Sequence, residues 1–169
     1  TGGTGFFGKS ILSYFYVNNP GIEKITVLSR HPEKLNDVFD TKSFPFEIEY
    51  VAQDIREPLL YHEPVDYIIH AAAESSTSLG VENPLLMRDV VVEGTKNVLE
   101  CTRRQKVKRL LFVSSGAVYG KQPSNLNHMP EDFKGAPDPL NSLNSYGCAK
   151  RQAENLCALY HHHYGIDYV

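Results

Sequence analysis

Long apolar runs, an excess of positive charge and a cysteine framework are all missing from this 169-residue sequence. No apolar run approaches the roughly 18 residues that a membrane-spanning helix needs, so no membrane partner is expected. The net charge of −3 argues against general binding to nucleic acid polymers or anionic surfaces. The cysteines are odd in number and lack metal-ligand spacing, which indicates reduced thiols in a cytoplasmic protein: Cys101, Cys148 and Cys157.

The composition is that of a globular domain, with 41% hydrophobic and 22% charged residues. A chain of this length forms one domain or most of one and can bury a sizeable core. The sequence begins directly at a glycine-rich loop, without the buried strand that normally precedes such a loop. We therefore expect residues 1–169 to be one dinucleotide-binding domain taken from a longer protein.

Helical and strand patterns alternate along the chain. Apolar residues at helical spacing predict helices, and short β-branched or continuously apolar segments predict strands. This alternation is typical of an α/β fold with a parallel, doubly wound sheet covered on both faces. The expected helices are residues 6–17, 84–104 and 145–164, with a short helix starting at residues 31–35, and the expected strands are residues 24–28, 46–51, 65–70 and 109–113.

The opening segment T-G-G-T-G-F-F-G places glycines at positions 2, 5 and 8. In a strand-to-helix turn, one glycine makes the tight turn, one lets backbone approach a phosphate, and one lets the helix pack closely. The N-terminus of the following helix would then face the pyrophosphate. Taken alone, the motif is equally compatible with an ordinary glycine-rich turn.

Tyr146 and Lys150 stand four residues apart at the start of a predicted helix and so share one face. A nearby ammonium favours the phenolate and is expected to lower the pKa of Tyr146, which would suit it to proton transfer with a hydroxyl or a ketone. Ser115 follows a predicted buried strand and could hold the reacting oxygen against Tyr146. The other interpretations are a surface Tyr–Lys pair and a helix-capping serine.

Four motifs in order resemble the extended short-chain dehydrogenase/reductases, the NAD-dependent epimerase/dehydratase group. They are T-G-x-x-G-x-x-G at 1–8, Asp54-Ile55, the His-Ala-Ala-Ala of residues 70–73, and Ser115 with Tyr146 and Lys150. The resemblance covers essentially the whole chain. It implies a Rossmann-like fold that here lacks its first strand and its C-terminal substrate lobe.

The same resemblance implies an enzyme that modifies a nucleotide sugar with a bound nicotinamide cofactor. Tyr146 would be the acid/base, Lys150 would hold the nicotinamide ribose, and Ser115 would take the family's catalytic Ser/Thr place. Asp54 would contact the adenine amino group and Ile55 its ring. The implied cofactor-binding residues are Gly2, Thr4, Gly5, Phe6, Phe7, Gly8, Ser29, Arg30, Asp54, Ile55, Ala71, Ala72, Ala73, Tyr146 and Lys150.

One departure from the family pattern concerns the cofactor. Members that prefer NAD carry an acidic residue after the second strand, whereas this chain has Ser29 and Arg30. A carboxylate would repel a 2′-phosphate and an arginine can bind one, so the sequence favours NADP over NAD. The alternative is that Arg30 is a solvated turn residue beside the adenine.

A second departure concerns the reaction. Dehydratases of this family follow the catalytic Ser/Thr place with Asp-Glu, but here the two positions are Gly116 and Ala117. Their absence argues against dehydration and favours a C4 epimerase, with a 4,6-dehydratase or a 4-keto reductase of the same family as the alternative. The pair Glu74-Ser75 after the alanines resembles dehydratases instead. A catalytically silent dinucleotide-binding protein is a further alternative, although Tyr146 and Lys150 are both present.

The resemblance also implies a homodimer through the helices at residues 84–104 and 145–164. A single-subunit mass in light scattering of the full-length protein would reject it. No metal site is expected at His161, His162 and His163, because consecutive helical residues point about 100° apart.

Overall fold

The computed structural model describes residues 1–73 and 82–169, so Glu74 and Ser75 lie outside the described residues. The bounds of the long helices and of the strands lie within two residues of their predicted bounds. Four short 3₁₀ helices, one of them where a short helix was expected, complete the described structure. The helices are α1 (Phe6–Asn18), α3 (Pro84–Gln105) and α4 (Ser145–Tyr164); the strands are β1 (Lys24–Ser29), β2 (Glu47–Ala52), β3 (Tyr67–His70) and β4 (Arg109–Phe112); the 3₁₀ helices are η1 (Pro32–Asp37), η2 (Thr41–Ser43), η3 (Gly116–Tyr119) and η4 (Ser142–Asn144).

The strands form two parallel pairs, β1 with β2 and β3 with β4. The first two residues lie between the pairs. The amide of Gly2 donates to the carbonyl of Leu28 at 3.3 Å, and the amide of Ala71 donates to the carbonyl of Thr1 at 3.2 Å. On the other edge of β4, the amide of Leu110 donates to the carbonyl of Asp167 at 2.9 Å, so the last residues of the chain run parallel to β4. The carboxyl ends of all strands therefore meet at one edge, as expected for a Rossmann-like sheet.

Local sequence explains where the two long helices begin and end. The side chain of Asn83 caps α3 by accepting from the amide of Leu86 at 3.0 Å, and Pro84 occupies the first turn, where its missing N–H costs little. Lys106, at the end of α3, has a left-handed φ of 52°. Gly165 ends α4 with a φ of 67°, which glycine adopts without a steric penalty.

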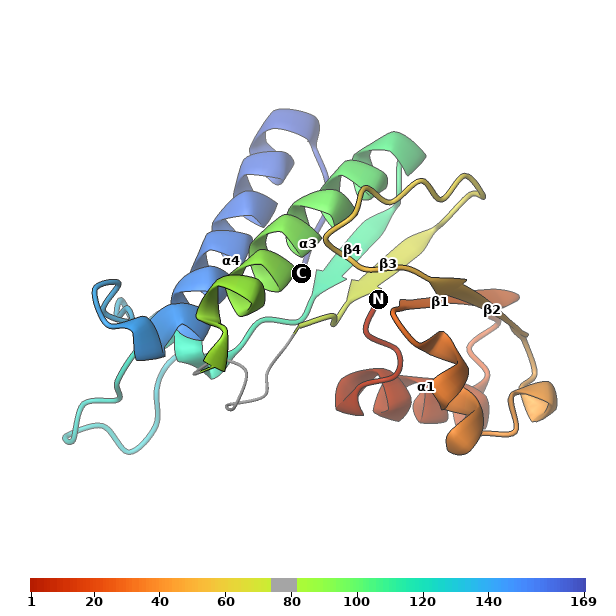
Figure 1. Cartoon of the computed structure of the whole chain (residues 1–169), viewed down its shortest axis with the longest axis horizontal. Helices are drawn as coiled ribbons and strands as arrows, with labels where there is room; N and C mark the ends of the chain where they lie inside the picture. The colour runs from red at the N-terminus through yellow and green to blue at the C-terminus, as the bar shows by residue number, and fades with distance from the viewer. Residues whose placement is uncertain (74–81) are drawn as a thin grey trace.

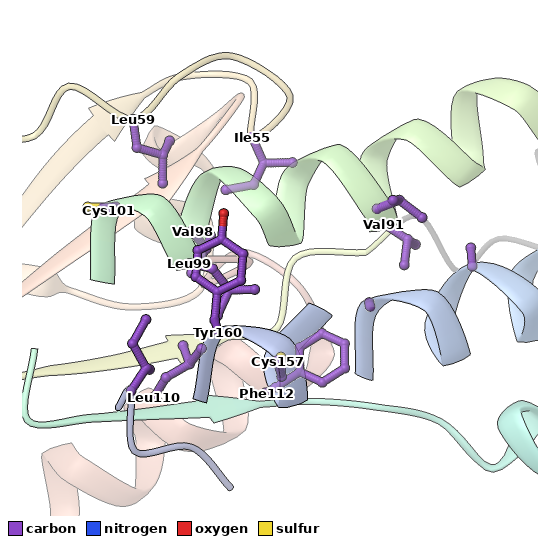
Figure 2. Close-up of a cluster of buried hydrophobic side chains, with 14 of the residues drawn as sticks. Ile55, Leu59, Val91, Val98, Leu99, Cys101, Leu110, Phe112, Cys157 and Tyr160 are labelled. Carbon is purple, nitrogen blue, oxygen red and sulfur yellow. The ribbon is translucent and has the colours of Figure 1, made fainter. Parts of the chain in front are cut away.

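The main core lies where α3 and α4 pack on the strands, as Figure 2 shows for its labelled side chains. Val98, Leu99, Leu110 and Cys157 are fully buried there. A smaller cluster around Leu12 lies between α1 and β1. Figure 1 shows α3 and α4 on one side of the strands and α1 on the other.

Helices cover both faces of β1, as predicted, and burial alternates along β4. Val27 and Leu28 point to opposite faces of β1, and both are buried, one in each cluster. In β4, burial alternates, and Leu111 is 39% exposed. The buried residues of β4, Leu110 and Phe112, belong to the core under α3 and α4.

The described part of the chain contains no helix that is both long and apolar enough to cross a lipid bilayer.

Candidate active site

Two glycines of the opening loop, Gly2 and Gly8, are required by close backbone contacts. Gly2 has a φ of 74°, and a Cβ on it would lie 2.6 Å from the carbonyl carbon of Ala71. A Cβ on Gly8 would lie 2.4 Å from the Cα of Gly3, so glycine allows α1 to pack directly on the loop. A Cβ on Gly5 would meet only the carbonyl oxygen of Gly2, at 3.3 Å. Gly5 therefore has open space beside it, where it lines a pocket.

A pocket of about 260 Å³ opens in front of this loop, at the carboxyl ends of β1, β2 and β3. It brings together ten of the predicted cofactor-binding residues with three further ones. The rings of Phe6 and Phe7 point away from the fold and are 80% and 57% exposed. The pocket is lined by Gly2, Thr4, Gly5, Leu28, Ser29, Arg30, Gln53, Asp54, Ile55, Ala71, Ala72, Ala73 and Val90.

The far wall of this pocket is built from the ends of β1 and β2. The Ser29 hydroxyl hydrogen-bonds to that of Thr4 at 3.1 Å and accepts from the amide of His31 at 3.3 Å. Both carboxylate oxygens of Asp54 accept from the guanidinium of Arg56, at 3.0 and 2.7 Å. Hydrogen bonds from Arg56, with a smaller contribution from the charge of Arg30, hold the pKa of Asp54 below its usual value. The predicted contact of Asp54 with an adenine would therefore be shared with Arg56.

Ile55 lies mainly in the core rather than in the pocket, with 6% of its surface exposed. A Cβ on Gly94 would lie 2.8 Å from its Cγ2 atom, so the glycine lets α3 pack against Ile55. This contact gives Gly94 of α3 a packing role. The predicted place of Ile55 beside an adenine ring stays a prediction.

A buried hydrogen-bond chain links the opening loop to α3 through His70. The Thr95 hydroxyl donates to the carbonyl of Val91 at 2.6 Å, so it must accept from Nε2 of His70, which lies 3.0 Å away. The Nδ1 atom then accepts from the Thr1 hydroxyl at 2.7 Å. Burial holds the pKa of His70 well below its usual value, which keeps the imidazole neutral. These hydrogen bonds attach the end of β3, just before residues 71–73, to both the opening loop and α3.

The three predicted catalytic residues come from two neighbouring segments. Tyr146 and Lys150 stand on the first turns of α4, and Ser115 follows β4 closely. A Cβ on Gly147 would lie 2.6 Å from the carbonyl oxygen of Ala117, so this glycine lets α4 approach the residues after Ser115. The Ser115 hydroxyl also accepts from the amide of Ala117 at 3.2 Å. The capping interpretation of Ser115 is thus correct, and a capping serine still faces Tyr146.

Lys150 is almost fully buried, with 2% of its surface exposed. Its ammonium donates to the carbonyl of Val113 at 2.7 Å and lies 4.7 Å from the ring centre of Phe112. Burial lowers its pKa to about 8, because an ammonium is poorly solvated there. This burial excludes the surface Tyr–Lys pair that the sequence had left open as an interpretation.

The prediction of a lowered pKa for Tyr146 is not met in this structure. Burial raises the pKa of its phenol, and a hydrogen bond with Ser115 opposes the rise only in part. The ammonium of Lys150, which was expected to supply the stabilising charge, is directed to Val113 instead. Phenolate formation would need further positive charge close to the ring.

Sequence reasoning missed three residues that shape the site. Thr1 was counted only as part of a glycine motif, yet its hydroxyl orients His70. The guanidinium of Arg56 donates to the carboxylate of Asp54, and the one sign of this in the sequence is that Arg56 stands two residues after Asp54. Glu154 accepts from the hydroxyl of Ser114 at 2.6 Å. Its spacing of four from Lys150, which repeats the spacing from Tyr146 to Lys150, could have revealed it.

Comparisons with known proteins agree on one family. A model described as "NAD dependent epimerase/dehydratase family" matches residues 1–169. A putative UDP-glucose 4-epimerase of Methanocaldococcus jannaschii is 34% identical, over 100% of this chain and 52% of that protein. UDP-glucuronic acid decarboxylase 5 of Arabidopsis thaliana is 29% identical, over 99% of this chain and 47% of that protein.

Two solved structures share the fold over 99% of this chain. One is the UDP-glucose 4-epimerase of Thermus thermophilus in complex with NAD, with a TM-score of 0.76, 25% identity and 51% of that chain covered. The other is a dTDP-glucose 4,6-dehydratase of Streptomyces venezuelae with NAD bound, with a TM-score of 0.79, 27% identity and 52% of that chain covered. The chain spans about half the length of these relatives. The glycine loop, the pocket and the Tyr146–Lys150 helix are thus those of a protein that belongs to the NAD dependent epimerase/dehydratase family.

Proposed function

We propose that the protein is a nucleotide-sugar C4 epimerase that works through a transient 4-keto sugar. One observation carries the proposal: Tyr146 and Lys150 lie on α4 beside Ser115, and the next two residues are Gly116 and Ala117. Proton transfer at one sugar oxygen needs a single acid/base, whereas elimination of water needs an additional acid/base pair. The relatives named above include both 4-epimerases and a 4,6-dehydratase.

The residues of the pocket fit a nicotinamide dinucleotide. Backbone atoms pack closely on Gly2 and Gly8. Gly5 has open space beside it and lines the pocket at the turn from the loop into α1. Backbone amides at this turn and the N-terminus of α1 would bind the pyrophosphate. The Lys150 ammonium would hold the nicotinamide ribose. When bound, the cofactor supplies the hydride acceptor and donor, together with a positive ring charge.

The chain's own residues would then carry the proton. Ser115 would hydrogen-bond the 4-oxygen of the sugar and hold it against the phenol of Tyr146. Tyr146 would accept the 4-hydroxyl proton as C4 is oxidised to the ketone. After the sugar turns, Tyr146 would return the proton as C4 is reduced on its other face. Burial raises the pKa of Tyr146 and the ammonium of Lys150 is directed to Val113, so the phenolate that this exchange requires would depend on the positive ring charge named above as well as on Lys150.

Incubation of the full-length protein with candidate nucleotide sugars tests this proposal. We expect the C4 epimer to accumulate, with no released 4-keto product and no loss of water, as measured by chromatography and mass spectrometry. Accumulation of a dehydrated 4-keto sugar would instead establish the dehydratase alternative. Net oxidation of the free cofactor with reduction of a keto sugar would establish a reductase. Dinucleotide binding without any turnover would indicate the silent binding protein.

We further propose that the cofactor is NADP rather than NAD, although the two solved relatives hold NAD. Ser29 stands where a ribose-binding carboxylate would be, and Arg30 lines the same end of the pocket. The carboxylate of Asp54 is already bound at both oxygens by Arg56, which offsets its repulsion of a phosphate. A 2′-phosphate would thus meet a locally cationic wall.

Equilibrium titration of nucleotide-free protein checks this preference without any catalytic assay. Arg30→Ala should weaken NADP binding by about tenfold, which corresponds to about 1.4 kcal/mol, and leave the Kd for NAD within about twofold. Lys34→Ala removes a cation that stands on the nearby η1 helix, and this change should alter neither Kd. Tighter binding of NAD by the unaltered protein, or equal losses for both dinucleotides, would overturn the preference. The homodimer through α3 and α4 stays a prediction.

A further inference from the structure

Two consecutive contacts attach α4 to the segment that carries Ser115. The ammonium of Lys150 donates to the carbonyl of Val113 at 2.7 Å, and one turn later the carboxylate of Glu154 accepts from the hydroxyl of Ser114 at 2.6 Å. Val113, Ser114 and Ser115 are adjacent in sequence. The backbone position of Ser115 is therefore set from α4 as well as from β4.

The spacing on α4 places the groups concerned on one face. Tyr146, Lys150 and Glu154 follow one another at intervals of four residues and so lie on successive turns. Gly147 approaches Ala117 closely, and Arg151 donates to the carbonyl of Val118 at 3.0 Å. The Ser114–Glu154 pair is the one side-chain-to-side-chain bond among these contacts. A bond of this kind is directional, so it limits sliding of the strand end along the helix.

Glu154 also bears on the charge balance around Lys150. The titratable groups that act on this ammonium or lie beside it are Glu154, Cys157 and Tyr146 on α4 and His70 on β3. Burial raises the pKa of Cys157 to about 11 and that of Tyr146 above its usual value, while burial lowers that of His70. Burial has the largest influence on the pKa of Lys150, and the carboxylate of Glu154 acts in the opposite direction, so it partly offsets the loss of solvation that the ammonium suffers.

We infer that Glu154 is a positioning residue for the proposed reaction: through Ser114 it holds Ser115 in reach of Tyr146, and its charge stabilises the ammonium of Lys150. The inference rests on the proposed epimerase function. Glu154 touches neither the phenol of Tyr146 nor the hydroxyl of Ser115 directly. Its effect is expected in the chemical step rather than in substrate binding, because small displacements of catalytic groups can cost about 100-fold in rate.

The test compares Glu154→Ala, Glu154→Gln and Ser114→Ala in the full-length protein. Glu154→Ala should lower kcat about 10- to 100-fold, with KM changed by less than about threefold. Glu154→Gln keeps an oxygen acceptor for Ser114, so kcat should recover to within about fivefold of wild type. Because Gln lacks the charge, the alkaline limb of its pH–rate profile should move to lower pH. Asn155→Ala, an exposed neighbour on α4, is the matched control and should leave kcat unchanged.

The pair itself is tested by the double variant. If Ser114 and Glu154 act through one contact, Ser114→Ala with Glu154→Ala should lose no more kcat than the worse single variant. The inference would be overturned if the kcat losses of the two single variants multiplied in the double variant. An unshifted pH profile in Glu154→Gln, or a kcat within twofold of wild type in Glu154→Ala, would also overturn it. If the wild-type protein epimerises no nucleotide sugar, the proposed function has failed first. If it does epimerise and the variants behave like Asn155→Ala, only the positioning role has failed.

Discussion

Replacing Tyr146 by phenylalanine is expected to lower kcat for C4 epimerisation by about 10²- to 10⁴-fold. The phenol is the group that would exchange the proton of the 4-hydroxyl, and it lies next to Ser115 at the carboxyl end of β4. Phenylalanine keeps the ring packing and removes only the oxygen. The steady-state rate should therefore fall, while the Kd for the dinucleotide stays within about threefold, as measured by titration.

The matched control is Tyr14→Phe on α1, where the ring is 61% exposed and distant from the pocket. It should keep full activity. A Tyr146→Phe protein with undiminished kcat would remove the tyrosine from the mechanism. Loss of both activity and the folded state would show that the hydroxyl acts in folding, which circular dichroism and thermal unfolding would reveal.

Replacing Lys150 by methionine is expected to have opposite effects on stability and activity. Burial lowers the pKa of this lysine from 10.5 to about 8, which corresponds to a cost of about 3 kcal/mol for keeping the charged form in the folded protein. Methionine has a similar length and no charge. After loss of the bond to Val113, we expect the free energy of unfolding at pH 7 to rise by about 1–3 kcal/mol. Epimerase activity should fall strongly, since the proposed ribose contact is removed.

The stability difference between Lys150→Met and wild type should depend on pH in one direction. Below pH 8 the lysine is charged in both states, and the full cost is present. Between pH 8 and 10.5 the folded state releases the proton first, so this cost is progressively relieved as pH rises. The stability difference between Lys150→Met and wild type should therefore shrink over this range in denaturant unfolding. A difference independent of pH, or a variant less stable at pH 7, would contradict it. Lys96→Met, on the exposed face of α3, should shift stability by less than about 0.5 kcal/mol.

The order of helices and strands could be predicted because it rests on local periodicity. Apolar spacing along α3, the asparagine and proline at its start and the glycine after α4 each report a local preference. The burial of individual side chains in an apolar strand could not be read in the same way. In β4, Leu110 and Phe112 lie in the core, whereas Leu111 is 39% exposed.

The residues of the candidate site could be named from motifs, but their states could not. Tyr146 and Lys150 were named from their spacing together with the family resemblance, yet burial moves their pKa values in directions that neither shows. Asp54 was identified as a cofactor contact, and its engagement by Arg56 depends on side-chain geometry. Glu154 bonds to a residue 40 positions earlier, which is a contact between a strand end and a helix.

The sequence by itself determined the element order and the glycine loop, and it named Ser115, Tyr146 and Lys150 as candidates, because residue type and spacing can be read without the fold. The tertiary structure alone decided where the ammonium of Lys150 is directed, how His70 is oriented and which carboxylate anchors Ser114. These depend on burial and on partners brought together from distant segments. A pKa or a hydrogen-bond direction is set by that surrounding structure.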